Sequence, residues 1–242
     1  MDKALLLAAG LGSRIRSVAG ETPKPLMLFA GAPVLVHNLR WLASSGVREV
    51  WINLHYGADQ IREAVGDGAG FGLAIHYVYE PELLGTAGAL ANLAEIMTSP
   101  MLVVYGDSLI RCDIGALANA HRRSRAEATV ALFDRDRHPH TGIAGGRVRL
   151  NASGAITAFA EGAGSAAGLV NAGVYVVEPS ILDLIPRGRL VDFGRDVFPA
   201  MLSRHRPLFG WVMEEAGYCL GLDTPESHAE GLRLLETGQV AP

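Results

Sequence analysis

Lysine and cysteine are scarce in this chain of 242 residues. Of its 21 basic residues only Lys3 and Lys24 are lysines, and the basic residues form no continuous tract. With a net charge of −4, the chain lacks the positive field that binding to a nucleic-acid backbone requires. The two cysteines, Cys112 and Cys219, fit a reducing compartment and are expected to be small buried side chains rather than a disulfide framework.

Long apolar runs are also missing, and none approaches the length of a membrane span. The start of the chain lacks a signal-peptide layout, because Arg14 and Arg16 follow the apolar residues 4–9 closely. No group of cysteines and histidines has the spacing of a zinc site. We therefore expect a cytoplasmic protein that binds neither a membrane nor nucleic acid. Any anionic ligand must be met by a local site rather than by the overall charge.

The composition favours a folded chain, with 49% hydrophobic and 19% charged residues. The length suits one α/β domain, 1–242, with a large core. Segments typical of strands and helices alternate along residues 1–135, and shorter alternating segments follow in 136–242. This order predicts a doubly wound, mostly parallel sheet between two layers of helices, a Rossmann-like three-layer αβα fold.

The hydrophobic pattern also predicts the individual elements. Strands are expected at residues 3–9, 49–54, 73–79, 101–105, 128–133, 170–177, 208–213 and 218–222. Helices are expected at residues 34–44, 58–65, 87–97, 114–123, 181–185, 197–203 and 225–236. The segment Asn151-Ala152-Ser153-Gly154 predicts a tight hairpin turn.

The most informative segment begins with the apolar residues Leu5 to Ala9, which are typical of a buried strand. It continues as Gly10-Leu11-Gly12-Ser13-Arg14, where two glycines let backbone amides approach a phosphate group. Pro23-Lys24-Pro25 follows, and the two prolines fix the backbone around a compact positive charge. A strand, an amide-rich turn and two cations together indicate a site for a polyphosphate.

This segment differs from two common nucleotide-binding motifs. The dinucleotide fingerprint G-x-G-x-x-G needs a third glycine at position 15, where Ile15 stands. The P-loop pattern G-x-x-x-x-G-K-[ST] fits neither Lys3 nor Lys24. Since Gly-x-Gly alone is common in ordinary tight turns, the interpretation depends on Arg14 and Lys24.

Two aspartates follow expected strands. Asp107 comes directly after the strand at 101–105, and Asp223 lies between the last strand and the last helix. In an open α/β sheet, ligands gather at the carboxyl ends of the strands, and carboxylates that face a phosphate loop are natural ligands of Mg²⁺. The alternative for Asp107 is a solvated turn. The alternative for Asp223 is a helix N-cap, although Thr224 could fill that role as well.

Residues 7–14 and 23–25 resemble the pattern L-A-A-G-x-G-x-R, followed by P-K-P, of the sugar-phosphate nucleotidyltransferases. Residues 15–18 are most similar to the branch of heptose-1-phosphate guanylyltransferases, beside the mannose-1-phosphate guanylyltransferases. The resemblance implies catalytic roles for Arg14, Lys24 and Asp107. It also implies that the nucleotide is bound by Leu7, Ala8, Ala9, Gly10, Gly12, Ser13 and Arg14.

The same resemblance implies a Mg²⁺ ion held by Asp107 and by a second acid near Thr224. Alignment on Thr-Pro puts Gly221 at that second position, whereas alignment on Leu-Asp-Thr puts Asp223 there. We favour Asp223, because the chemistry needs an acid.

The segment from Glu80 to Gly88 resembles the part of these enzymes that recognises the base, and this implies nucleotide binding by Glu80, Gly85 and Thr86. Guanine presents two adjacent donors, N1–H and the N2 amino group, and one ionised carboxylate can accept both. Glu80 or Glu82 therefore favours guanine. The alternative is a solvated loop before a helix, where the helix dipole favours acids.

The acceptor side resembles the family less closely. Gly142, Glu161 and Asn171 match positions that bind the sugar phosphate, but Gly162 stands where the family has a lysine. An arginine must then meet the acceptor phosphate, and the sequence does not choose among Arg187, Arg189 and Arg195. By the resemblance, 1–135 is the nucleotide-binding half and 136–242 is the sugar-phosphate-binding half.

The resemblance implies a Mg²⁺-dependent enzyme of nucleotide-sugar and polysaccharide biosynthesis. It would transfer a nucleoside monophosphate from an NTP, with GTP favoured, to a sugar 1-phosphate of heptose or mannose type and release pyrophosphate. Two alternatives stay open. One is the same fold acting on a non-sugar phosphate or phosphonate, and the other is a regulatory relative that binds nucleotide without turnover. The oligomeric state is also open, with a homodimer among the options.

Overall fold

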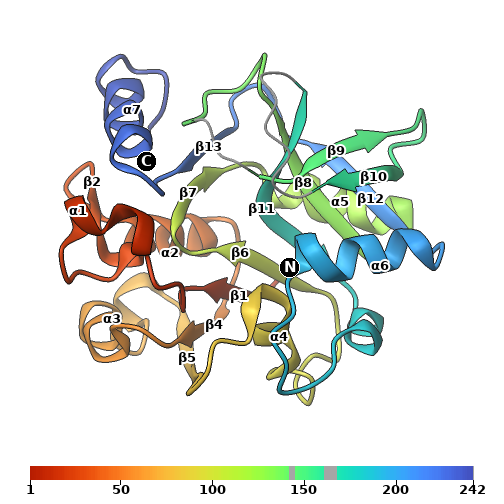
Figure 1. The fold of residues 1–242 in the computed structure, drawn as a ribbon, viewed down its shortest axis with the longest axis horizontal. Helices are drawn as coiled ribbons and strands as arrows, with labels where there is room; N and C mark the ends of the chain where they lie inside the picture. The colour runs from red at the N-terminus through yellow and green to blue at the C-terminus, as the bar shows by residue number, and fades with distance from the viewer. Residues whose placement is uncertain (142–144, 161–167, 242) are drawn as a thin grey trace.

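The computed structural model of the chain describes residues 1–141, 145–160 and 168–241. It confirms the predicted α/β fold, a mostly parallel central sheet with helices on both faces (Figure 1). The strands are β1 (Lys3–Leu7), β2 (Leu28–Phe29), β3 (Ala32–Pro33), β4 (Glu49–Leu54), β5 (Ala74–Tyr79), β6 (Met101–Tyr105), β7 (Ser108–Arg111), β8 (Ala128–Asp134), β9 (Arg147–Leu150), β10 (Ile156–Ala160), β11 (Leu169–Val177), β12 (Leu208–Val212) and β13 (Tyr218–Gly221).

The helices alternate with these strands. The α-helices are α1 (Arg16–Ala19), α2 (Val34–Ser44), α3 (Ala58–Val65), α4 (Gly85–Ala91), α5 (Ile114–Ser124), α6 (Phe198–Ser203) and α7 (Pro225–Glu236). Short 3-10 turns are η1 (Ser13–Ile15), η2 (Lys24–Leu26), η3 (Ala69–Phe71) and η4 (Pro179–Leu184), and η5 (Phe193–Val197) is a π turn. No helix in the described ranges is both long and apolar enough to cross a membrane.

Nine strands of the described residues form the main sheet. Their order is β10-β9-β11-β6-β1-β4-β5, and β8 joins β11 to β12. The strands β6, β1, β4 and β5 are parallel, so their carboxyl ends meet at one edge. The register places Leu7 beside both Asn53 and Tyr105. The residues that follow these strands therefore lie next to one another.

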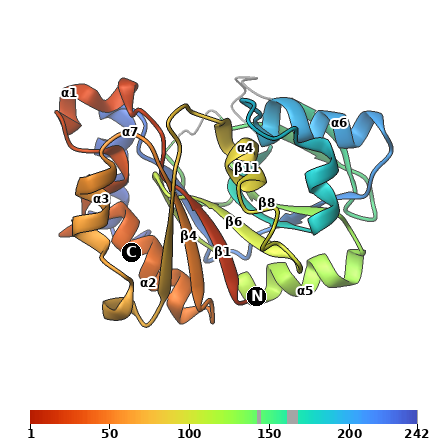
Figure 2. The ribbon, with the colours of Figure 1, turned by 90° about the horizontal axis from the view of Figure 1, so that it is seen from below.

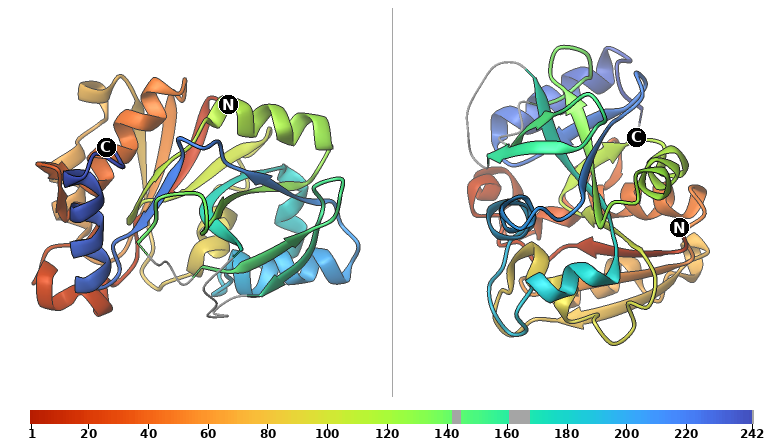
Figure 3. Two further views of the ribbon diagram at one scale, coloured as in Figure 1. Left: turned by 90° about the horizontal axis from the view of Figure 1, so that it is seen from above. Right: turned by 90° about the vertical axis from the view of Figure 1, so that its right-hand side faces the viewer.

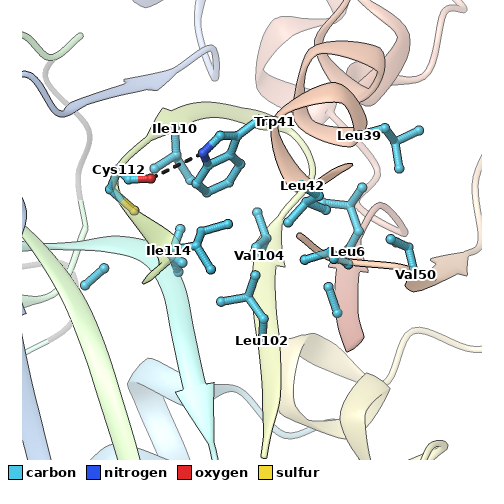
Figure 4. Packing of buried hydrophobic residues seen from close by; sticks show 14 of the residues in the cluster. Leu6, Leu39, Trp41, Leu42, Val50, Leu102, Val104, Ile110, Cys112 and Ile114 are labelled. Atoms are coloured by element: carbon cyan, nitrogen blue, oxygen red, sulfur yellow. Dashed lines mark hydrogen bonds between the residues drawn. The ribbon is translucent and has the colours of Figure 1, made fainter. Parts of the chain in front are cut away.

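Alternating side chains of β1 build the two apolar layers. Leu6 is fully buried on the face covered by α2, where it shares a cluster with Leu39 and Leu42 (Figure 4). Leu5 is buried on the opposite face, in a cluster with Leu90 of α4 and residues of α6. Figure 2 shows α2 and α3 on one side of the sheet and α4 and α6 on the other. Both faces of the parallel strands are thus covered, as a parallel sheet requires.

A third apolar cluster fixes the end of the chain. Leu234 of α7 packs in a buried group with Phe29 of β2 and Leu220 of β13. The ring of His228 also contacts the carbonyl oxygen of Leu28, at 3.4 Å. Figure 3 shows α7 beside the N-terminal segment that contains α1. The segment between β13 and α7 is therefore held close to the loop that follows β1.

Several elements differ from their predicted form. The helix predicted at 181–185 is the 3-10 turn η4, the strand predicted at 3–9 ends at Leu7, and the short strands β2 and β3 were not predicted. Tertiary contacts account for two further differences. The helix predicted at 87–97 begins at Gly85 and ends at Ala91, because the chain then continues through tighter bonds such as Leu93 N–H to Leu90 O. The strand β7 was not predicted, since its four residues gain their pairing only from β13, far along the chain. These differences arise from tertiary contacts and not from the local pattern.

We predict that Leu6→Ala lowers the free energy of unfolding by about 2–5 kcal/mol, because it leaves a cavity in a fully buried layer. Urea denaturation measures the change. Leu28→Ala is the control, since Leu28 is 64% exposed and its loss should change stability by no more than about 0.5 kcal/mol. Equal small effects of both substitutions would contradict this description of the core.

Candidate active site

A cavity of about 270 Å³ opens at the carboxyl edge of the parallel strands. The strands β1, β4 and β6 contribute Leu7, Asn53 and Tyr105 to its wall, and Glu80 follows β5 directly. Seven of the wall residues are among those predicted for the site, namely Leu7, Ala9, Gly10, Glu80, Gly85, Thr86 and Asp107. The other five, which were not predicted, are Asn53, Leu83, Tyr105, Leu190 and Asp192.

The loop after β1 turns at Gly12, which adopts a positive φ of 58°. A Cβ atom at this position would lie only 3.1 Å from the Cβ atom of Lys24. A side chain here would therefore be strained and would also press on Lys24. The turn is closed by the N–H of Ile15, which donates to the carbonyl oxygen of Gly12 at 3.2 Å. Gly10 is exposed, and Ser13 begins the 3-10 turn that follows.

Lys24 lies at the centre of a charged group. Its ammonium donates to Oδ2 of Asp107 at 2.8 Å and also to Oδ1 of Asp223. The lysine side chain is only 4% exposed, whereas the two carboxylates are 30% and 28% exposed. The Arg14 guanidinium lies 3.4 Å from the same oxygen of Asp223 and is 69% exposed. The structure thus brings together four residues that the sequence places in three separate segments.

The two aspartates reach this point from different directions. Asp107 follows β6, where Gly106 allows close packing, since a Cβ there would lie 2.8 Å from the carbonyl oxygen of Leu7. Asp223 follows β13, and Thr224 rather than Asp223 caps α7, in a capping box with Ser227. The alternative role of Asp223 as a helix cap is therefore filled by its neighbour, and its carboxylate faces Lys24.

Burial lowers the pKa of Lys24, but the carboxylates of Asp107 and Asp223 together raise it by more. The net pKa lies above the ordinary value of 10.5, so the ammonium stays charged at neutral pH. A buried lysine keeps its charge here because two partners compensate its loss of water.

Glu80 lines the same cavity, directly after β5, and is 1% exposed. Its Oε1 accepts from the amide of Asn53 at 2.9 Å, and its Oε2 accepts from the N–H of Leu84 at 3.2 Å. Asn53 Oδ1 in turn accepts from the N–H of Ala8 at 2.8 Å. This carboxylate is therefore buried and anchored, and not part of a solvated loop.

The turn that follows Glu80 packs against the second half of the chain. Gly85 adopts a positive φ of 75°, and a Cβ atom there would lie 2.5 Å from the carbonyl oxygen of Val191. The Thr86 hydroxyl donates to Oδ2 of Asp192 at 2.7 Å and accepts from the N–H of Phe193 at 3.0 Å. These contacts close the cavity on the side of residues 190–193.

A family model described as nucleotidyl transferase matches residues 3–219. The chain belongs to this family. It is 35% identical over 242 residues to the mannose-1-phosphate guanylyltransferase of Mycobacterium tuberculosis. The alignment covers 99% of this chain and 66% of that protein. It is 30% identical over 227 residues to the UTP–glucose-1-phosphate uridylyltransferase of a Synechocystis species. That alignment covers 88% of this chain and 58% of that protein. The chain thus spans just under two thirds of the first relative and less of the second.

Two solved structures share the fold. HddC from Yersinia pseudotuberculosis, complexed with GMP-PN, superposes with a TM-score of 0.82 at 23% identity, covering 97% of this chain and 100% of that one. A putative glucose-1-phosphate thymidylyltransferase from Bacillus anthracis gives 0.81 at 20% identity, with 97% and 95% covered. These likenesses support the α/β fold of the family.

The residues predicted for the acceptor side of this nucleotidyl transferase stay predictions. Gly142 and Glu161, like Gly162, lie outside the described residues. Asn171 lies in β11, where its amide donates to the Tyr175 hydroxyl at 2.7 Å and its Oδ1 accepts from the N–H of Gly173 at 2.9 Å. Its side chain is thus held within its own strand.

The three candidate arginines are all exposed. Arg187 lies 3.7 Å from the carboxylate of Glu95, in an ion pair of two exposed side chains. The backbone N–H of Arg195 donates to Asp192, the residue that lines the cavity. Arg189 directly precedes Leu190, another residue of the cavity wall, so the choice among Arg187, Arg189 and Arg195 stays open.

Asn53 is the main residue that the sequence analysis did not select. It is a polar residue near the end of an otherwise apolar strand, Trp51-Ile52-Asn53-Leu54, and it is 3% exposed. That pattern could have indicated it, because buried polar groups need partners and strand ends border the ligand site. Asp192 stands in no comparable local pattern, and only the fold brings it to the cavity.

We predict that Lys24→Met destabilises the protein near neutral pH, because it leaves two carboxylates facing each other without their shared cation. Because the pKa of Lys24 is higher in the folded than in the unfolded state, its charge contributes to the free energy of unfolding. This contribution is complete below about pH 10.5 and is lost as the pH rises through the folded-state pKa. The difference in free energy of unfolding between the two proteins should therefore narrow above about pH 10.5.

Urea denaturation of both proteins across this range measures the difference. Lys3→Met is the control, because Lys3 lies over the Trp51 ring, 5.7 Å from its centroid, at the opposite end of β1. If the difference in free energy of unfolding between the native protein and Lys24→Met stayed constant with pH, the charged contacts assigned to Lys24 would be wrong.

Proposed function

We propose that this protein transfers a guanosine monophosphate group from GTP to a sugar 1-phosphate of mannose or heptose type and releases pyrophosphate. The observation that carries the proposal is the contact of Lys24 with Asp107 and Asp223, because Asp107 lines the same cavity as Glu80. A relative with 35% identity is named a mannose-1-phosphate guanylyltransferase, which supports this substrate class.

We assign a Mg²⁺ ion to Asp107 and Asp223. Their carboxylates suit this metal, because both contact the same ammonium and so converge on one point, and both are partly open to solvent. Among the described residues no group of three or more His, Cys, Asp or Glu side chains could hold a metal. Two carboxylates with substrate phosphates and water are the usual ligand set of Mg²⁺. When bound, the ion neutralises and orients the phosphates.

The residues of the chain supply positioning and charge. The backbone amides of residues 10–13 and the Arg14 guanidinium would bind the β- and γ-phosphates of the nucleotide. Lys24 would stabilise the charge that develops on the α-phosphate. An oxygen of the acceptor phosphate attacks the α-phosphorus in line, the bond to the β-phosphate oxygen breaks, and pyrophosphate leaves. The acceptor is already an anion, so the step needs no covalent intermediate on the protein.

The base assignment rests on Glu80. The named relatives include both a guanylyltransferase and a uridylyltransferase, so their names alone do not select the nucleotide. A buried, anchored carboxylate presents acceptors, and guanine presents two adjacent donors on one edge. Uracil presents a mixed edge, which an amide would fit better.

The remaining assignments follow from this function. Residues 1–135 form the nucleotide-binding half and residues 136–242 form the half that binds the sugar phosphate. The cysteines Cys112 and Cys219 are both free and buried, which agrees with a cytoplasmic protein.

The proposal is tested by pyrophosphate release with four NTPs against a panel of acceptors. The panel contains mannose, heptose and glucose 1-phosphates, a non-sugar phosphate and a phosphonate. We expect the highest kcat/KM with GTP and a mannose- or heptose-type 1-phosphate. Turnover only with a non-sugar acceptor would replace the sugar assignment, and nucleotide binding without any turnover would indicate a regulatory protein.

We predict that Lys24→Ala lowers kcat by about 10²- to 10³-fold, because it removes a fixed positive charge from the developing charge of the transition state. Steady-state pyrophosphate release measures kcat, and circular dichroism verifies that the variant is folded. Lys3→Ala is the matched control, since Lys3 is the other lysine of the chain and lies at the far end of β1. A Lys24→Ala enzyme with near-normal kcat would remove Lys24 from the mechanism.

A further inference from the structure

We propose that Asn53 is a positioning residue for base recognition, which holds Glu80 in the orientation that selects guanine. The inference rests on the proposed function, because it assumes that Glu80 recognises the base. It extends that function by assigning the selectivity to a pair of residues on neighbouring strands, and not to the carboxylate alone.

The orientation of the Asn53 amide follows from its partners. Its Oδ1 accepts from the backbone N–H of Ala8 at 2.8 Å, and a backbone N–H can only donate. The oxygen must therefore face Ala8, and the NH₂ group must face Oε1 of Glu80, at 2.9 Å. The usual ambiguity between the two ends of an asparagine amide is thereby removed.

Glu80 is then held at both carboxylate oxygens. Asn53 donates to Oε1 from β4, and the N–H of Leu84 donates to Oε2 at 3.2 Å from the turn before α4. Two donors on different elements fix the plane of the carboxylate. Both donors are neutral groups, so they orient the charge without cancelling it. Each oxygen keeps a further acceptor site, and the pair matches two adjacent donors on a base edge.

The position of Asn53 also links the two ends of the nucleotide site. Asn53 lies beside Leu7 in the sheet register, and Ala8 leads into the loop predicted to bind phosphate. The same amide therefore holds the start of that loop and the carboxylate assigned to the base. With Asn53 only 3% and Glu80 only 1% exposed, water cannot readily replace a lost donor.

The distinguishing measurement compares GTP with inosine triphosphate, which lacks the N2 amino group of guanine. Binding of each nucleotide to the whole protein is measured by calorimetry, so that the result does not depend on the acceptor. The variant is Asn53→Leu, which keeps the size of the side chain and removes both hydrogen bonds. We expect the preference of the native protein for GTP over inosine triphosphate to fall by roughly ten-fold in this variant.

Asn38→Leu is the matched control. Asn38 is equally buried, and its amide donates to the carbonyl oxygen of Ser108 at 2.8 Å without contacting Glu80. We expect this variant to lose stability and keep the nucleotide preference. If Asn53 had only a structural role, Asn53→Leu would weaken the binding of GTP and of inosine triphosphate equally. The ratio of the two affinities would then stay unchanged.

Glu80→Gln separates failure of the inference from failure of the proposed function. If the native protein prefers GTP, and Glu80→Gln loses this preference while Asn53→Leu keeps it, the positioning role is overturned and the proposed function stands. If the native protein binds both nucleotides equally, recognition of guanine by Glu80 is itself wrong, and the inference falls with it. Loss of the preference in both variants, but not in Asn38→Leu, supports the role of Asn53.

Discussion

The contact of one buried ammonium with two carboxylates is the interaction on which the arrangement of this molecule depends. Lys24 is 83 residues from Asp107 and 199 residues from Asp223 in the sequence, so the contact joins three distant segments. Two like charges can share this site only because the lysine lies between them, and the lysine can be buried only because of them. The close packing of Pro23 against Gly57, where a Cβ atom would lie 2.1 Å from Cγ of Pro23, leaves the Pro-Lys-Pro segment little freedom.

Helices and strands were predictable where the pattern that specifies them lies within their own residues. The predicted bounds of the helices at 34–44, 58–65 and 225–236 agree with α2, α3 and α7, because their apolar periodicity and end residues lie within the segments themselves. The strand β7 lacked such a signal, since four residues acquire their strand form from β13. The start of α4 at Gly85 likewise lies against a distant segment, because Gly85 and Gly88 closely approach residues 189–191.

The candidate site could be proposed residue by residue from the sequence, but the contacts between its residues could not. Arg14, Lys24 and Asp107 stand in recognisable local motifs, and their identities could be inferred without a structure. The link from Ala8 through Asn53 to Glu80 depends on the register of two parallel strands, which pairs Leu7 with Asn53. A shift of that pairing by one residue would turn Asn53 to the other face of the sheet. Local sequence does not contain this register, so the connection appears only in the fold.

The contacts around Lys24 and those around Glu80 differ in what a nucleotide bound as proposed would change. The carboxylates of Asp107 and Asp223 already share the cation Lys24, so a metal bound there as proposed would compete with Lys24 for them. At Glu80, neutral donors orient the carboxylate and leave each oxygen a further acceptor site, which a base bound as proposed would use. Under the proposed function, the base would therefore add hydrogen bonds to Glu80, whereas the phosphates and metal would change the ion pairs around Lys24.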